Sequence, residues 1–211
     1  MDDMIYILFI SLFVPILLMA NLIEKKARLP ILFVLVGIFI SVFASEVNGV
    51  LRIVLPLSNY EFTIIVTPMT EEFLKALPIL FYAVFLSDKA EILFTASMAT
   101  GIGFAVLENT YYLLNVATWN IPDAVIRAFG TGLMHGMCTL LVGAGITFVK
   151  KKRKIFWVGT FALLSTAIIY HGIYNMLVQS DYAILGHLLP ISTYIPPFIW
   201  RLKKKHSIRK T

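Results

Sequence analysis

Residues 24–55 of the chain read EKKARLPILFVLVGIFISVFASEVNGVLRIVL. The first five positions hold three basic residues, and the apolar run that follows from 30 to 55 carries charge only at Glu46 and Arg52. A helix rises about 1.5 Å per residue, so ~20 apolar residues cross the ~30 Å hydrocarbon core of a bilayer. This stretch therefore predicts a transmembrane helix with a basic segment at one end.

The whole chain has the same character. Of its 211 residues, 59% are hydrophobic and 14% are charged, and the mean hydropathy is +0.84. A soluble globular domain has about 25% charged residues. The composition excludes a soluble fold, a disordered chain and an extracellular domain. The single cysteine, Cys138, excludes an internal disulfide framework.

Seven apolar segments long enough to span a bilayer are separated by short connections. They cover residues 4–23, 30–55, 61–86, 92–116, 122–149, 155–178 and 182–200. The third and fifth are long enough to tilt or break. We therefore expect an all-α, polytopic membrane bundle of about seven helices that forms one domain over residues 1–211.

The basic residues predict the orientation of this bundle, because Lys and Arg favour cytoplasmic loops. Fifteen of the eighteen fall at 25–28, 89, 150–154 and 201–210, whereas Arg52 and Arg127 fall on the other side. This distribution predicts an external N-terminus and a cytoplasmic C-terminus in the cell membrane. Anionic lipid accounts for the positive charge, so no nucleic-acid partner is expected. The acidic start MDDM lacks the basic region of a cleavable signal peptide, so the first span is expected to be retained.

Charged and imidazole side chains nevertheless lie within the apolar segments. Each charge at mid-bilayer costs about 2.5–3.5 kcal/mol on insertion scales, so such residues are rare unless paired or functional. Glu46 has no partner at helical spacing and is interpreted as structural. The full set comprises Glu46, Glu71, Glu72, Lys75, Glu108, His135 and His171.

The sequence EEFLK places two carboxylates beside a lysine. Glu71 and Lys75 are four residues apart and share a helix face, so they are expected to pair, with Lys75 neutralising the glutamates. Glu72 is rotated by about 100° and can point elsewhere. In three later segments an acid or imidazole also has a polar residue one turn away: Glu108 with Tyr112, His135 with Thr139, and His171 with Asn175.

Four of these residues fall at similar predicted depths. Counted inward from the outer ends of their segments, Glu71 lies at ~15 Å, Glu108 at ~12 Å, His135 at ~20 Å and His171 at ~10 Å. Side chains at one level of four spans predict a shared site within residues 61–178. The site is expected to open toward the extracytoplasmic side.

Carboxylates and imidazoles at one level are the ligand set of a divalent metal, with Zn²⁺ the best fit. Bound zinc lowers the pKa of its water to about 7. The candidate ligands are Glu71, Glu72, Glu108, His135 and His171.

A metal-free scheme is equally open, in which a buried glutamate activates water by acid–base chemistry. In both schemes Asn175 and Thr139 are candidate donors to an oxyanion. Both schemes describe hydrolysis within the membrane.

The motifs EEFLK, FAVLE (104–108), HGMCT (135–139) and HGIYN (171–175) resemble those of the PrsW family of intramembrane proteases. This family belongs to a wider group that includes the type II CAAX prenyl endopeptidases. Glu108 stands where the CAAX enzymes carry histidine, and lysine follows the EE pair closely, which favours the PrsW branch. The resemblance implies cleavage of a single-pass, membrane-anchored anti-sigma factor near its extracytoplasmic face, which releases a stress-response sigma factor after further proteolysis.

Other intramembrane protease chemistries lack their signatures here. The sequence has no HExxH, GxSG or GxGD motif. Two alternatives remain beside the protease: a non-catalytic scaffold of the same fold, and a proton- or cation-coupled transporter that uses the buried Glu and His residues as a relay.

Overall fold

The computed structural model describes residues 3–20, 24–115 and 121–208, and throughout these ranges the secondary structure is helical with no strand. Arg209 and Lys210 of the predicted basic tail lie outside these ranges, as do the predicted segment ends Ile23 and Val116. The helices are α1 (Asp3–Ala20), α2 (Lys25–Val54), α3 (Asn59–Glu61), the π-helix η1 (Phe62–Val66), α4 (Thr67–Phe85), α5 (Ala90–Asn115), α6 (Ile121–Ile146), α7 (Arg153–Val178) and α8 (Ala183–Ile208).

Each of the seven predicted segments corresponds to a long helix of the described chain. The third segment, 61–86, was expected to be long enough to tilt or break, and in the structure it is divided into a π-helical turn and an α-helix. A capping box starts it: the Ser58 hydroxyl accepts from the Glu61 amide at 3.2 Å, and the Glu61 carboxylate accepts from the Ser58 amide at 2.9 Å. The wider π-helical turn η1 follows, and Pro68 then lies at the start of α4. The fifth segment forms one helix, α6, followed by a turn.

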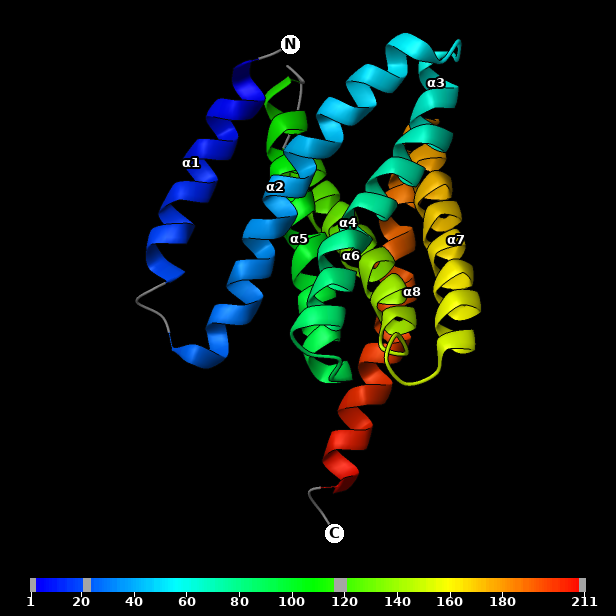
Figure 1. Cartoon of the computed structure of the whole chain (residues 1–211). Helices are drawn as coiled ribbons and strands as arrows, with labels where there is room; N and C mark the ends of the chain where they lie inside the picture. Colours follow the sequence, from blue (N-terminus) through cyan, green and yellow to red (C-terminus); the bar gives the residue numbers. More distant parts are fainter. Residues whose placement is uncertain (1–2, 21–23, 116–120, 209–211) are drawn as a thin grey trace.

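Helix α5 lies at the centre of the bundle (Figure 1). It packs against α2 on one side and against α6 on the other. Helix α1 covers α2 and α5 at one edge, and α7 and α8 pack against α6 at the opposite edge. Helix α4 contacts α2, α5, α6 and α7, so the elements that carry the predicted site residues are neighbours in space.

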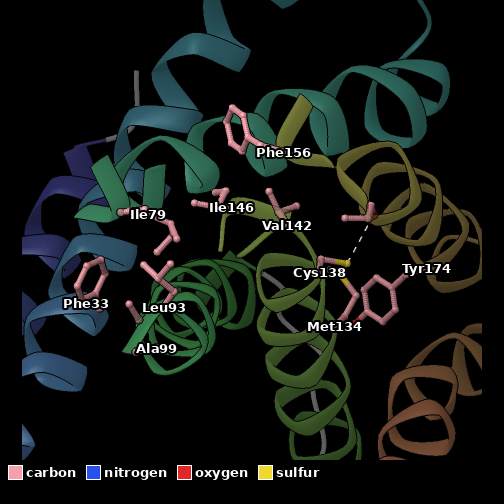
Figure 2. Close-up of a cluster of buried hydrophobic side chains, with 13 residues drawn as sticks. Phe33, Ile79, Leu93, Ala99, Met134, Cys138, Val142, Ile146, Phe156 and Tyr174 are labelled. Atoms are coloured by element: carbon pink, nitrogen blue, oxygen red, sulfur yellow. Dashed lines mark hydrogen bonds between the residues drawn. The ribbon is translucent and has the colours of Figure 1, made fainter. Parts of the chain in front are cut away.

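A buried apolar cluster fills the space between α2, α4, α5, α6 and α7 (Figure 2). Phe33, Ile79 and Leu93 lie at one end of the cluster, and Met134 and Tyr174 lie at the other. The Cys138 thiol donates to the Ala167 carbonyl at 3.5 Å, which joins α6 to α7. Close packing of these side chains stabilises the association of the helices that carry the site.

Four helices of the described chain are long and apolar enough to cross a membrane: Ala27–Val54, Ala90–Asn115, Ile121–Ile146 and Arg153–Val178. Met4–Met19 and Ala183–Pro196 are shorter apolar helices. Basic segments gather at one end of the bundle, where the start of α2, the α4–α5 and α6–α7 connections and the C-terminal end of α8 lie together (Figure 1). The orientation of this end toward the cytoplasm remains a prediction.

Candidate active site

The structure brings together polar side chains from α4, α5, α6 and α7, the four segments singled out by the sequence. Glu71, Glu72 and Lys75 lie on α4, and Glu108 lies on α5. The two histidines come from α6 and α7, and their rings meet edge to face with centroids 4.9 Å apart. The predicted convergence on one level of the bundle is therefore present in the fold. Glu46 lies apart from it and accepts a 2.5 Å hydrogen bond from Tyr6.

Glu72 is fully buried and joins two of these helices. Its Oε1 accepts from Lys75 Nζ at 2.7 Å and from His171 Nδ1 at 2.8 Å. Because a carboxylate only accepts, His171 carries its proton on Nδ1, and Nε2 keeps its lone pair. Glu72 thus fixes both the tautomer and the orientation of the His171 ring, as carboxylates do behind metal-binding histidines.

A second chain of contacts runs from Lys75 to Glu108. The Lys75 ammonium is fully buried, lies 2.7 Å from His135 Nδ1, and stands 4.6 Å from the centre of the Phe104 ring. An ammonium only donates, so His135 Nδ1 accepts and Nε2 carries the proton. That nitrogen donates to Glu108 Oε2 at 2.5 Å. Both nitrogens of His135 are therefore engaged.

Glu71 has a carboxylate oxygen that makes no hydrogen bond to the described residues. Its Oε2 is buried and finds no hydrogen-bond partner in the described part of the chain. The nearest complementary group is His171 Nε2 at 3.9 Å. Three possible ligand atoms, one from each of Glu71, His135 and His171, all lie within 4.8 Å of one another. A buried oxygen that lacks a partner is costly unless it binds something. Glu72 Oε2 is also buried without a partner, but Glu72 Oε1 accepts two hydrogen bonds, so Glu71 is the glutamate whose carboxylate is less committed to contacts within the protein.

The expected pairing of Glu71 with Lys75 is wrong: the ion pair that forms is Glu72–Lys75, three residues apart. Residues three and four apart are both neighbours on a helix, so spacing alone does not choose between them. The choice is made by His135 on α6, since its Nδ1 draws the ammonium to the Glu72 side.

The predicted oxyanion donors make other hydrogen bonds. Thr139 donates to the His135 carbonyl at 2.9 Å, within α6. Asn175 donates from Nδ2 to the Thr63 carbonyl of η1 at 3.0 Å, which ties α7 to the π-helix. An amide nitrogen has a second hydrogen, so Asn175 keeps one donor for another partner. Tyr112, expected beside Glu108, lies under the Arg127 guanidinium at 3.6 Å from the ring centre.

Four further polar residues next to the site were not predicted. Arg127 is buried, with Nη2 3.8 Å from Glu108 Oε1. Thr131, Tyr174 and His187 form a hydrogen-bonded chain, with distances of 2.7 Å and 2.9 Å through the tyrosine hydroxyl. Two features of the sequence point to three of these residues. Arg127 and Thr131 precede His135 at intervals of four, on one face of α6, and His187 is an imidazole within the apolar segment 182–200.

Two glycines allow the helices to approach closely enough for these contacts. A Cβ on Gly101 of α5 would stand 2.6 Å from the His135 carbonyl carbon, and a Cβ on Gly172 of α7 would stand 2.7 Å from the Ile64 carbonyl oxygen of η1. Neither position has room for a side chain, as is typical of small residues at membrane helix contacts. The first contact places α5 against α6, and the second places His171 beside α4.

A family model for the PrsW family intramembrane metalloproteases matches residues 25–201, which include all four helices of the site. The chain belongs to the PrsW family. It is therefore a multi-pass membrane protein of an intramembrane protease family, as its sequence motifs predicted. Comparison with curated proteins and with solved structures gives no significant match.

One further feature of this PrsW family member adjoins the site. An apolar groove of about 310 Å³ runs between α7 and the η1–α4 segment. Two of its lining residues, Met69 and Gly172, are close in sequence to Glu71 and His171. The groove is suited to an apolar peptide segment rather than to a polar solute.

Proposed function

We propose that the protein is an endopeptidase that hydrolyses a peptide bond of a single-pass membrane protein near the extracytoplasmic face of the cell membrane. Family membership supports peptide hydrolysis within the membrane. The observation that carries the assignment to this site is the Glu71 carboxylate, buried 3.9 Å from His171 Nε2 and otherwise free of bonds among the described residues. An anti-sigma factor is the substrate that the family resemblance favours.

The two adjacent glutamates are assigned different roles on the basis of their contacts. Glu71 is the group that acts on the ligand or substrate, because its Oε2 is open. Glu72 is a positioning residue, because it is already bonded to Lys75 and His171. The buried Lys75 offsets the negative charge of the pair.

The site also fits a zinc ion. Two ligands of a tetrahedral Zn²⁺ with bonds of ~2.0–2.1 Å stand about 3.3 Å apart, which is close to the 3.9 Å between Glu71 Oε2 and His171 Nε2. These two residues would hold the metal. His135 would join them only if its Nε2 proton passed to Glu108 and its Nδ1 gained a proton from Lys75, because the imidazole nitrogen that binds a metal must carry a free lone pair. Zinc bound there would supply a Lewis acid that makes water nucleophilic at neutral pH.

The residues of the chain itself account for the proton transfers of peptide hydrolysis. In the metal-free scheme, Glu71 takes a proton from a water molecule as the water oxygen attacks the peptide carbonyl, and Glu71 returns that proton to the leaving amine when the C–N bond breaks. The second hydrogen of the Asn175 amide is the proposed donor to the oxyanion that forms between the two steps. Glu108, bonded to His135, is the further acid–base candidate.

A reconstituted cleavage assay tests the proposal. Purified protein in liposomes is incubated with a single-pass membrane substrate that carries a candidate anti-sigma factor, with and without a chelator. Cleavage should be lost in Glu71→Gln and His171→Ala and kept in Glu46→Gln, whose carboxylate lies outside the site. Cleavage that survives the first two substitutions would overturn the assignment. Ion flux through the same liposomes that depends on Glu71 would instead support the transporter alternative.

A further inference from the structure

A second cavity, of about 280 Å³, lies beside the site and is lined in part by polar groups. It is bounded by α5, α6, the end of α7 and the start of α8. The starts of α6 and α8 lie at the end of the bundle opposite the basic segments (Figure 1). Its lining residues include Tyr112, Asp123, Arg127, Ile184 and His187.

Arg127 connects this cavity to the proposed active site. Its guanidinium lies in the cavity wall over the Tyr112 ring, and its Nη2 is 3.8 Å from Glu108 Oε1. Glu108 leaves 34% of its side-chain surface uncovered by protein, although its other oxygen is bonded to His135. A carboxylate within a membrane segment normally faces the bundle interior or a water-filled space.

A second connection between the cavity and the site is a chain of hydrogen bonds that begins at His187. It lines the cavity, and its Nδ1 is bonded through the Tyr174 hydroxyl to Thr131. Tyr174 lies three residues after His171, and Thr131 lies four residues before His135, so this buried chain passes one helical turn from both histidines. Polar groups on two sides offer water the two to four partners that it needs in a buried site.

We propose that this cavity is the entrance through which the hydrolytic water reaches Glu108 and His135. The inference rests on the proposed peptidase function. Water has a share of ~30 Å³ in the liquid, so the cavity has room for several molecules. Water then enters between α6 and α8, whereas the apolar groove that suits the substrate lies between η1 and α7. Separate routes let a peptide stay in lipid while its scissile bond meets water.

Cysteine accessibility tests the entrance without reference to cleavage. In a Cys138→Ala background, single cysteines replace Ile126 and Ile184, which line the cavity, and their neighbours Val125 and Leu185, which differ in depth by only ~1.5 Å and face about 100° away. A charged, membrane-impermeant methanethiosulfonate reagent is added to sealed proteoliposomes. The lining cysteines should react at least ~10-fold faster, because the reacting species is the hydrated thiolate. Equal rates at all four positions would overturn the proposal.

A blocking substitution tests whether this entrance serves the reaction. Ala183→Trp places a large side chain in the wall of the cavity, and Leu185→Trp adds the same bulk on another face of α8. Only Ala183→Trp should slow labelling at position 126 and lower kcat, with KM for the substrate unchanged. Blocked labelling with unchanged kcat would overturn the role of the cavity. Loss of cleavage in Glu71→Gln is a separate result that concerns the proposed function alone.

Discussion

His171 Nδ1 donates to Glu72 Oε1 over 2.8 Å, and this contact joins α7 to α4 across 99 residues of chain. The same oxygen accepts from Lys75, which in turn donates to His135. A single carboxylate thereby sets the position of both histidines of the site. Adjacent glutamates in one motif acquire different surroundings, because Glu72 is bonded within this network whereas Glu71 Oε2 is buried without a hydrogen-bond partner among the described residues.

Substitution of the two glutamates should therefore give different results. Glu71→Gln is expected to lower kcat by at least ~10²-fold, because it removes the general base of the metal-free scheme or the carboxylate ligand of the zinc scheme, with little change in thermal stability in detergent. Glu72→Gln leaves the buried Lys75 without its counter-charge and should cost about 3–5 kcal/mol of unfolding free energy. The double variant Glu72→Gln, Lys75→Met should recover stability but not cleavage. Equal stability losses in the two single variants would contradict this division of roles.

Zinc content tests the ligand assignment directly. The purified protein is expected to hold zinc by elemental analysis, and Glu71→Ala and His171→Ala should lose it. Glu72→Ala should retain Glu71 and His171 as ligands but weaken zinc binding by about 10–100-fold in chelator competition, because the hydrogen bond that orients His171 is lost. Glu46→Gln is the control. Zinc that remains bound in Glu71→Ala would exclude this residue as a ligand, and active protein without zinc would favour the metal-free scheme.

Because α5 packs closely against α6 at Gly101, the stability of the protein should depend strongly on glycine at this position. Gly101→Ala forces a methyl group against the His135 backbone and should cost about 1–3 kcal/mol of stability, together with part of the cleavage activity, because His135 moves. Gly132→Ala is the matched control on α6. Nothing in the described residues lies within 4 Å of its added Cβ, and alanine is the better helix former by up to ~1 kcal/mol. Thermal unfolding in detergent and the cleavage rate measure both effects.

The contact between α1 and α2 should affect stability without affecting chemistry. Tyr6→Phe removes the 2.5 Å hydrogen bond to Glu46 and is expected to cost about 1.5–3 kcal/mol, the range for a hydrogen bond to a charged group. The cleavage rate should be unchanged, because among the described residues Glu46 makes its hydrogen bond to Tyr6 and no hydrogen bond or ion pair to the site residues. A loss of cleavage in a folded Tyr6→Phe protein would show that Glu46 serves the reaction.

The sequence determined which segments are helical and which of them carry the candidate site residues. Long apolar runs permit little but helices in a bilayer, because every backbone polar group must be satisfied internally. Glu71, Glu108, His135 and His171 were identifiable from the cost of placing such side chains in lipid. The family motifs followed from the same residues and were confirmed by the match over residues 25–201.

Only the tertiary structure decided which side chains are partners. Spacing along α4 allows Lys75 to pair with either glutamate. His135 of α6, which is 60 residues from Lys75 in the sequence, determines which pair forms. In the same way, Arg127 and His187 acquired their positions beside the site only through the packing of α5, α6 and α8. Helical periodicity fixes neighbours within one helix, whereas contacts between helices depend on rotations and close approaches that local sequence does not encode.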